Sequence, residues 1–412
     1  MNFPLSCFHL RRRFSPPSHP LHPQPRDRTS PLRAEGSVEL DLSCDAHDPR
    51  VSSPPNSKRH CRAGLVCGGI STGRFRIPPE DVHALCTDLH LSLHDLLLSW
   101  VRPASTHARP PVSSFKVGAV GLGTSGAVYV GVNLELHGLP LHNSVHAEQF
   151  VIANMVAHGE QGLEAIAISA APCGHCRQFY CELTGAEKVT FLFGEQSCRL
   201  TELLPHRFGP KDLLDPLPPL LLEPQGWRKA GLRPSPTAQT WIESQTSSLQ
   251  QAAIAAVERA RESYAPYSQC PSGVSILLRG EEAEVEAKDD QTRTRGEAPA
   301  PPGPEGPRAE EADGEPCARQ NTTTTSTTTS TTTSFYSGSY LESAAYNPSL
   351  PPLQACLVNA VAAGMPHYTS VAHVVLAERG GGGVQQAGVL RHTLETIAPS
   401  ARLHVVELEL DR

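Results

Sequence analysis

The chain has 412 residues, with 35 Lys and Arg against 42 Asp and Glu, so its formal net charge is −7. This length allows two or three domains with cores of their own. The mildly acidic balance argues against a protein that wraps nucleic acid, since that needs clustered Lys and Arg. No run of about 18 apolar residues occurs, so no membrane span is predicted. The 12 cysteines follow no disulfide framework, and no signal peptide is recognisable, which together favour a reducing, cytoplasmic compartment.

The first 77 residues are rich in Pro, Ser and Arg. Up to Arg33 they contain six arginines and a single acidic residue, Asp27. An Arg-rich, Ser-rich and acid-poor composition is typical of organelle transit peptides. Closely spaced prolines, however, prevent the amphipathic helix that many such peptides form. We predict that residues 1–77 are a disordered extension, with organelle targeting as the alternative.

Helical and strand patterns alternate from residue 78 to residue 215, which predicts a first domain over 78–215. Residues 216–240 contain closely spaced prolines and are predicted to form a linker. A second domain is expected over 241–412. An acidic stretch and a Thr/Ser tract interrupt it at 281–334. Neither can bury enough apolar surface to offset its ordering entropy, so this segment is predicted to be a disordered insertion.

Residues with metal and proton chemistry stand at two predicted helix starts. Apolar residues recur at helical spacing after His146, and Glu148 follows it by two positions. An apolar run at 165–168 predicts a strand, and soon after it Cys173 and Cys176 open a second helix. Two cysteines three residues apart in a first helical turn face the same side. They can therefore share a metal ion, with His146 as a third ligand.

Three protein ligands leave the fourth position of a tetrahedral zinc ion open to water, which is the catalytic arrangement and not the closed structural one. Glu148 is placed to move protons to and from such water, whose pKa zinc lowers towards neutrality. A lone C-x-x-C pair would also suit a structural zinc knuckle or a redox pair, but neither explains the upstream His146 and Glu148. His175, between the two cysteines, is expected to turn away from both and to pack or face solvent.

The segments around these motifs resemble cytidine deaminase, in particular the two-domain, homodimeric type known from bacteria and plants. The resemblance is carried by residues 115–123, by the N-x-E motif at 133–135 and by the two metal motifs. The pattern H-x-E…P-C-x-x-C is the signature of zinc deaminases. The resemblance implies an α/β fold, namely a three-layer α/β/α sandwich with a mixed sheet, duplicated in tandem.

The same resemblance implies a role for individual residues. It implies that His146, Cys173 and Cys176 bind one Zn²⁺ ion and that Glu148 is the catalytic proton carrier. The implied substrate contacts, an aromatic ring for the pyrimidine and the N-x-E motif for the sugar, are Phe115, Asn133, Leu134 and Glu135. A carboxylate accepts hydrogen bonds from sugar hydroxyls and repels phosphate, so Glu135 favours a nucleoside over a nucleotide.

The second packed region repeats the first. Residues 349–364 align without a gap with residues 144–159, and six of the 16 positions are identical. In this register Pro351 stands at the place of His146, and no cysteine follows Cys356. We therefore expect a second copy that keeps the fold, holds no zinc and supports the first copy.

The expected reaction is hydrolytic deamination of cytidine and deoxycytidine to uridine and deoxyuridine, with release of ammonia, in pyrimidine salvage. Two alternatives stay open. One is a deaminase of cytidine nucleotides or nucleic acid bases, which would need basic residues near the pocket. The other is a catalytically inactive regulatory or scaffolding relative. The expected partners are a small nucleoside and a second chain in a homodimer, with no nucleic acid and no membrane.

Overall fold

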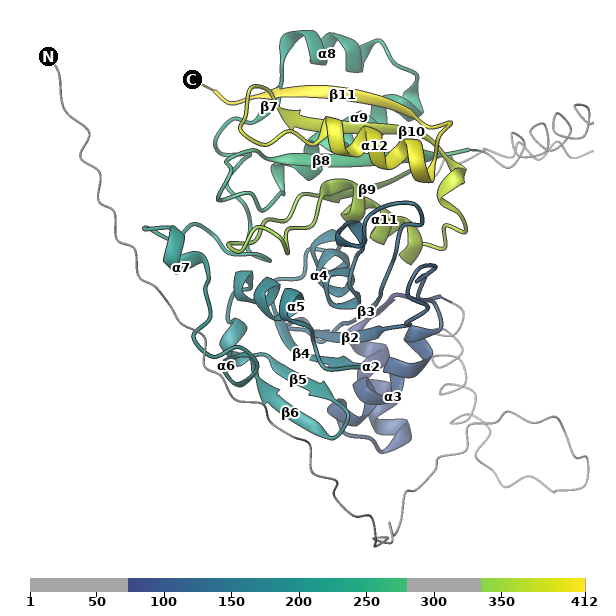
Figure 1. The fold of residues 1–412 in the computed structure, drawn as a ribbon, viewed down its shortest axis with the longest axis vertical. Helices are drawn as coiled ribbons and strands as arrows, with labels where there is room; N and C mark the ends of the chain where they lie inside the picture. Colours follow the sequence, from purple (N-terminus) through teal and green to yellow (C-terminus); the bar gives the residue numbers. More distant parts are fainter. Residues whose placement is uncertain (1–72, 280–334, 412) are drawn as a thin grey trace, which may run out of the picture. The chain divides into compact units, whose positions relative to one another are not determined.

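The computed structural model describes residues 73–279 and 335–411, and all of these belong to one compact unit. The predicted insertion at 281–334 and residues 1–72 of the predicted extension lie outside the described residues. Two sheets with flanking helices follow one another along the chain (Figure 1). In the described ranges no helix is long and apolar enough to cross a membrane.

The first copy of the fold is built on a six-stranded mixed sheet of order β1-β3-β2-β4-β5-β6. Only β4 and β5 are parallel neighbours. The strands are β1 (Arg76–Ile77), β2 (Gly118–Gly123), β3 (Val128–Val132), β4 (Leu163–Ile168), β5 (Thr190–Phe193) and β6 (Gln196–Arg199). The helices are α2 (Pro79–Leu89), α3 (Leu93–Ser105), η1 (Leu141–Asn143), α4 (Ala147–Ala157), α5 (Gly174–Phe179), η2 (Tyr180–Glu182), η3 (Ala186–Lys188), α6 (Leu200–Leu203) and α7 (Pro210–Leu213).

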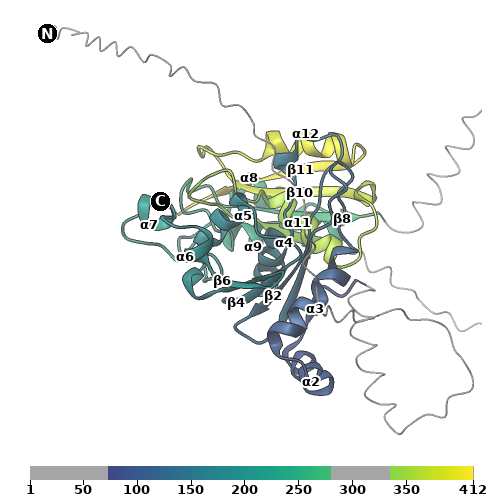
Figure 2. The same ribbon diagram turned by 60° about the horizontal axis from the view of Figure 1, so that its bottom comes forward.

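Helices cover both faces of this sheet, and two glycines allow their close approach. A Cβ atom at Gly118 would lie 2.4 Å from the carbonyl oxygen of Val101 in α3, and one at Gly131 would lie 2.3 Å from that of Ala147 in α4. Gly131 pairs with Ala119, the neighbour of Gly118, and neighbouring strand residues face opposite sides. α3 and α4 therefore lie on opposite faces (Figure 2). This confirms the predicted three-layer arrangement.

The second copy is built on a five-stranded sheet of order β7-β11-β10-β8-β9, in which β10 and β11 are parallel. Its strands are β7 (Arg233–Pro234), β8 (Ser272–Leu278), β9 (Phe335–Ser339), β10 (Val371–Arg379) and β11 (Arg402–Glu409). Its helices are α8 (Pro236–Glu243), α9 (Ser247–Arg261), α11 (Pro352–Ala362), η4 (Tyr368–Ser370) and α12 (Ala387–Ile397).

The two copies repeat the same glycine contacts at equivalent positions. A Cβ atom at Gly273 would lie 2.4 Å from the carbonyl oxygen of Ala256 in α9, as at Gly118 against α3. One at Gly338 would collide with the backbone of Cys356 in α11, as at Gly131 against α4. Both helices of the aligned pair, α4 and α11, have 11 residues and start at matching positions of the predicted register. The predicted duplication is confirmed.

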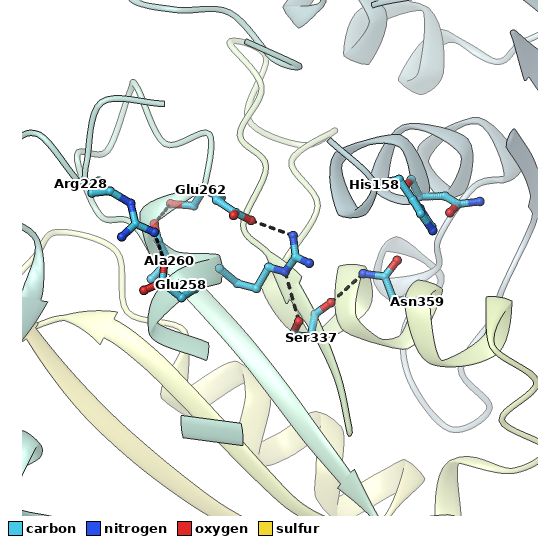
Figure 3. A network of polar contacts seen from close by, with 10 residues as sticks. His158, Arg228, Glu258, Ala260, Glu262, Ser337 and Asn359 are labelled. Atoms are coloured by element: carbon cyan, nitrogen blue, oxygen red, sulfur yellow. Dashed lines mark hydrogen bonds and ion pairs between the residues drawn. The ribbon is translucent and has the colours of Figure 1, made fainter. Parts of the chain in front are cut away.

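α4 and α11 pack against each other where the two copies meet (Figure 1). One hydrophobic core continues through both copies. A polar network beside the helix pair holds the second copy together (Figure 3). In it Arg259 donates to Ser337 Oγ at 3.1 Å and to Glu262 at 2.7 Å, and Asn359 of α11 donates to the Ser337 carbonyl oxygen at 2.6 Å. These bonds tie α11, on which α4 rests, to β9 and α9.

The equivalent strand pairs β2–β3 and β8–β9 have connections of different length in the sequence. In the first copy Glu160 accepts hydrogen bonds from the Thr124 hydroxyl at 3.0 Å and the Ser125 N–H at 3.2 Å, and so holds a short turn. In the second copy Met365 stands at the position of Glu160 and cannot hold a turn in this way. There the strands pair as far as Leu277 and Phe335, and residues 280–334 stand between β8 and β9 in the sequence.

The predicted start of the first domain lies too late in the chain. Arg76 and Ile77 form β1 by antiparallel pairing with β3, and the Ile77 side chain is completely buried. A two-residue strand carries too little hydrophobic pattern to be recognised in a sequence. The first copy therefore begins before residue 78.

The predicted linker at 216–240 is largely packed. Leu221 is buried and bridges to Leu183 in the first copy, whereas Arg233 and Pro234 form β7 in the second. Pro236 opens α8. Prolines are tolerated on edge strands and in first helical turns, where no N–H is needed. The proline content that suggested a linker is thus compatible with folded structure, and the second copy begins before residue 241.

Candidate active site

Both predicted helix starts are present, and they carry the predicted ligands. His146 is the N-cap residue of α4, and Cys173 is the N-cap residue of α5. Cys176 lies in the first turn of α5 and is 1% exposed. The structure thereby brings the three residues together from two segments that are separated by β4.

The three side chains fit a zinc ion. Their ligand atoms all lie within 4.8 Å of one another, and this is the one such group of three or more among the residues that the structure describes. His146 Nδ1 and Cys173 Sγ are 3.5 Å apart. Zinc bonds of about 2.1 Å to nitrogen and about 2.3 Å to sulfur, at a tetrahedral angle, would separate these donors by about 3.6 Å. One nitrogen and two sulfur ligands leave one coordination position for a reactant.

The thiol groups of the two cysteines differ in pKa. Burial raises the pKa of the Cys176 thiol, and its hydrogen bond with Cys173 raises it further. This hydrogen bond, with a further contribution from His146, lowers the pKa of the Cys173 thiol to about 3. A metal ion would therefore meet one thiolate that is already formed, and thiolate is the form of cysteine that binds metal.

Glu148 lies in the first turn of α4 and is 5% exposed. Burial raises the pKa of its carboxyl group above the ordinary value. A raised pKa makes a carboxyl group a better proton acceptor than an ordinary one, which suits a residue that takes up a proton and delivers it again. Glu148 and His146 line the same cavity, so the carboxyl group faces the space in which a reactant would lie.

This cavity has a volume of about 350 Å³. Besides the metal-binding residues it is lined by apolar and small polar side chains and by the carboxyl groups of Glu135 and Glu148. Three of the four predicted substrate contacts, Phe115, Asn133 and Glu135, belong to its wall. Leu134 does not, so its predicted contact with a substrate stays a prediction. It is 1% exposed, and its backbone pairs with Val145. Alternate residues of an extended segment face opposite sides, so Leu134 faces the core.

The two polar residues of the N-x-E motif also hold the loop at the cavity mouth. Glu135 accepts hydrogen bonds from the Val112 and Ser113 N–H groups at 2.9 Å each and from the Ser113 hydroxyl at 2.5 Å. Asn133 accepts from the Val117 N–H and donates to the Phe115 carbonyl oxygen. Ser113 was not predicted as part of the site, although its recurrence as Ser268 in the second copy was a signal.

The equivalent place in the second copy keeps these loop contacts but not the polar side chains. Glu342 accepts from the N–H groups of Tyr267 and Ser268, as Glu135 does from Val112 and Ser113. The larger Tyr340 stands at the position of Asn133 and is 8% exposed. Pro351 and Leu353 stand at the positions of His146 and Glu148. The second copy therefore keeps the fold without the residues that would bind a metal or carry a proton at this place.

Two further side chains hold His146. The ring of His175 stacks on the ring of His146, with centroids 4.6 Å apart and an interplanar angle of 11°. Of the two roles expected for His175, packing and exposure to solvent, the structure shows packing. Gln149 accepts a hydrogen bond from the His146 N–H at 3.2 Å and donates to the Pro348 carbonyl oxygen at 2.8 Å. Gln149 thereby links the ligand to the second copy. Its role depends on a contact across 199 residues, which sequence spacing does not reveal.

The fold and this site define a zinc-dependent deaminase. Two parts of the chain, residues 92–193 and residues 200–285 with 324–391, match the family described as cytidine and deoxycytidylate deaminase zinc-binding region. Cytidine deaminase 1 of Arabidopsis thaliana is 36% identical over 346 residues, which cover 80% of this chain and 96% of that protein. The chain belongs to the cytidine deaminase family.

Bacterial relatives match over a similar length. The cytidine deaminase of Shewanella amazonensis is 31% identical over 331 residues, which cover 80% of this chain and 86% of that protein. The crystal structure of cytidine deaminase from Mycobacterium tuberculosis is 30% identical and covers 28% of this chain and 96% of its own, with a TM-score of 0.26.

Proposed function

We propose that the first copy catalyses the hydrolytic deamination of cytidine and deoxycytidine to uridine and deoxyuridine, with release of ammonia. The observation that carries this proposal is a buried carboxyl group, Glu148, in one cavity with a ligand set that fits zinc. The names of the relatives as cytidine deaminases support the choice of the base.

The residues divide the chemistry between them. A zinc ion held by His146, Cys173 and Cys176 would supply a Lewis acid that makes water nucleophilic at neutral pH. Glu148 takes a proton from the attacking water, whose oxygen forms a bond to C4 of the ring. Glu148 then delivers this proton to ring N3. It takes the remaining proton from the new C4 hydroxyl group and delivers it to the departing amine, so that the C4–N bond to the amine breaks, the C4 carbonyl forms and ammonia leaves.

The cavity wall supports a nucleoside as substrate. Phe115 offers a ring face to the base, and Asn133 and Glu135 are the proposed partners of the sugar hydroxyls. Each carboxylate oxygen has two lone pairs, so Glu135 can accept a hydroxyl while it holds the loop. None of the described residues that line the cavity is Lys or Arg. A phosphate or a nucleic acid backbone would have no positive partner there.

We also propose a homodimer that acts in pyrimidine salvage in the cytoplasm. Three apolar side chains at or beside the cavity mouth, Val112, Phe115 and Leu141, are 50%, 60% and 56% exposed. Such a patch is costly in water and is typical of a surface that a partner covers. A second copy of the chain would bury it.

Ammonia release from four substrates tests this proposal. The purified protein is given cytidine, deoxycytidine, cytidine monophosphate and a cytosine-containing single-stranded oligonucleotide. We expect turnover of both nucleosides and little of the other two. Preferred turnover of the monophosphate or of the oligonucleotide would contradict the substrate assignment. Failure with all four, in a protein that holds zinc, would favour an inactive relative.

A further inference from the structure

Glu182 is a completely buried carboxylate outside the substrate cavity. It ends η2, which directly continues α5. No Lys or Arg pairs with it in the described parts of the chain. Removing a carboxylate from water without a countercharge is unfavourable unless hydrogen-bond donors surround it. The position of Glu182 therefore depends on the groups that donate to it.

The donors to this carboxylate come from the second copy. The Tyr264 and Tyr267 hydroxyls donate to Oε2 at 2.9 Å and 2.6 Å, and the Ala344 N–H donates to Oε1 at 2.8 Å. The first copy thus extends a carboxyl side chain into the second copy, where three hydrogen bonds hold it.

The held residue belongs to the segment that carries two metal ligands. α5 has six residues, and η2 continues it to Glu182, less than two helical turns beyond Cys176. Helices this short are not stable alone, so tertiary contacts fix their position. Arg177 fixes the start of the segment by donating to the Pro172 carbonyl oxygen at 2.7 Å. Glu182 fixes its end.

The tyrosine that makes the shortest bond has no counterpart in the first copy. Tyr267 stands where the first copy has Val112, at the mouth of the substrate cavity. Its N–H donates to Glu342, which is the loop contact shared by both copies, and its hydroxyl donates to Glu182. In the first copy this loop borders the substrate cavity. In the second copy the equivalent loop instead contacts the segment of the first copy that carries Cys173 and Cys176.

From these contacts we propose that Glu182 is a positioning residue, through which the second copy fixes Cys173 and Cys176 and slows the loss of the metal. This inference rests on the proposed function, because that function places zinc on these cysteines. Partners that orient metal ligands typically change metal affinity or activity by about 10-fold to 100-fold when removed.

The test compares two Tyr→Phe variants that each remove one tyrosine–glutamate hydrogen bond. Tyr267→Phe removes the bond to Glu182. Tyr129→Phe is the matched control, because the buried Tyr129 hydroxyl donates to Glu160 at 3.1 Å within the first copy. Zinc release from the full-length protein to a chromogenic chelator is followed well below the melting temperature of every variant. We expect release to be about 10-fold faster in Tyr267→Phe and unchanged in Tyr129→Phe.

Kinetics with cytidine give a second readout. In Tyr267→Phe we expect a lower kcat with little change in KM, since the substrate-contacting residues are unaltered. If Tyr267→Phe does not fold, Tyr264→Phe, which loses a longer bond to the same oxygen, is expected to show a smaller acceleration of zinc release. Equal release rates in the wild type and in the folded variants would overturn the positioning role alone. A wild type that retains no zinc would instead contradict the proposed function.

Discussion

Replacing Glu148 and replacing one of the three metal-binding residues are expected to have different effects on zinc content and on activity. Glu148→Gln keeps the shape of the side chain but cannot carry protons. We expect the variant to retain zinc and to lose kcat by about 10³-fold, within the range of general acid–base catalysis. Ammonia release measures the rate, and metal analysis of the same preparation measures the zinc. A near-normal rate would exclude Glu148 as the proton carrier.

Removal of a metal-binding side chain should abolish both zinc binding and deaminase activity. Cys176→Ala leaves two of the three donors, so we expect the purified variant to contain little zinc and to be inactive. Cys198→Ala is the matched control, because Cys198 lies in β6 and is not part of the ligand group. Metal content measured by mass spectrometry distinguishes them. Zinc retained in Cys176→Ala would show that the metal is held elsewhere.

The residues of the site fall into two groups according to how far the sequence predicted them. Cys173 and Cys176 were predicted because their spacing within one helical turn fixes their relative position. Glu182 and Gln149 were not predicted, since their partners lie more than 80 residues away along the chain. The side chain of Leu134 lies apart from those of Asn133 and Glu135, because a motif names consecutive residues whereas an extended segment sends every second one to the opposite face.

At the scale of elements, the helix that starts at His146 depends on a glycine beneath it. Gly131→Ala would place a Cβ atom 2.3 Å from the Ala147 carbonyl oxygen. α4 must then move away from β3, which we expect to lower the free energy of unfolding by about 1–3 kcal/mol and to reduce activity. Chemical denaturation measures the stability.

Gly388→Ala provides the contrasting variant. Gly388 lies in α12, and a Cβ atom there would meet nothing within 4 Å. Alanine in a helix is preferred over glycine by about 0.5–1 kcal/mol, so this variant is expected to be slightly more stable and fully active. Destabilisation of equal size in both variants would contradict the role of close helix–strand contact at Gly131.

The elements also show why the second copy could be found without a structure. α4 and α11 occupy matching residues, so an ungapped comparison of sequence aligned them. The strand β7 and the start of α8 were assigned to a linker instead. Their prolines, Pro234 and Pro236, occupy positions that require no N–H, and composition does not separate such positions from a true linker.

At the scale of the whole molecule, the exposed apolar patch at the cavity mouth predicts self-association. We expect the protein to sediment at about twice its chain mass of 44.3 kDa. Leu141→Glu should produce monomers, because it places a charge in the patch. Ile254→Glu, which alters a similarly exposed side chain on α9, should leave the dimer intact. A wild type that is monomeric at micromolar concentration would contradict the proposed homodimer.

The two copies contribute different features to the molecule: the first carries the candidate metal ligands, and the second contacts the helices that carry them. The second copy lacks the His and Cys ligands, yet it contacts both helices that carry the candidate metal ligands, through Pro348 at α4 and through the tyrosines that donate to Glu182. Loss of the ligand residues in this copy leaves these contacts in place.

The pairing of β8 with β9 on either side of residues 280–334 has a consequence for engineering. The chain leaves β8 and re-enters β9 at positions that face each other, with Leu277 opposite Phe335. Closure of a longer loop costs only about 0.6 kcal/mol for each doubling of its length. A reporter protein whose own termini lie close together could therefore replace residues 280–334. The fusion would carry a label within the chain while both ends stay free.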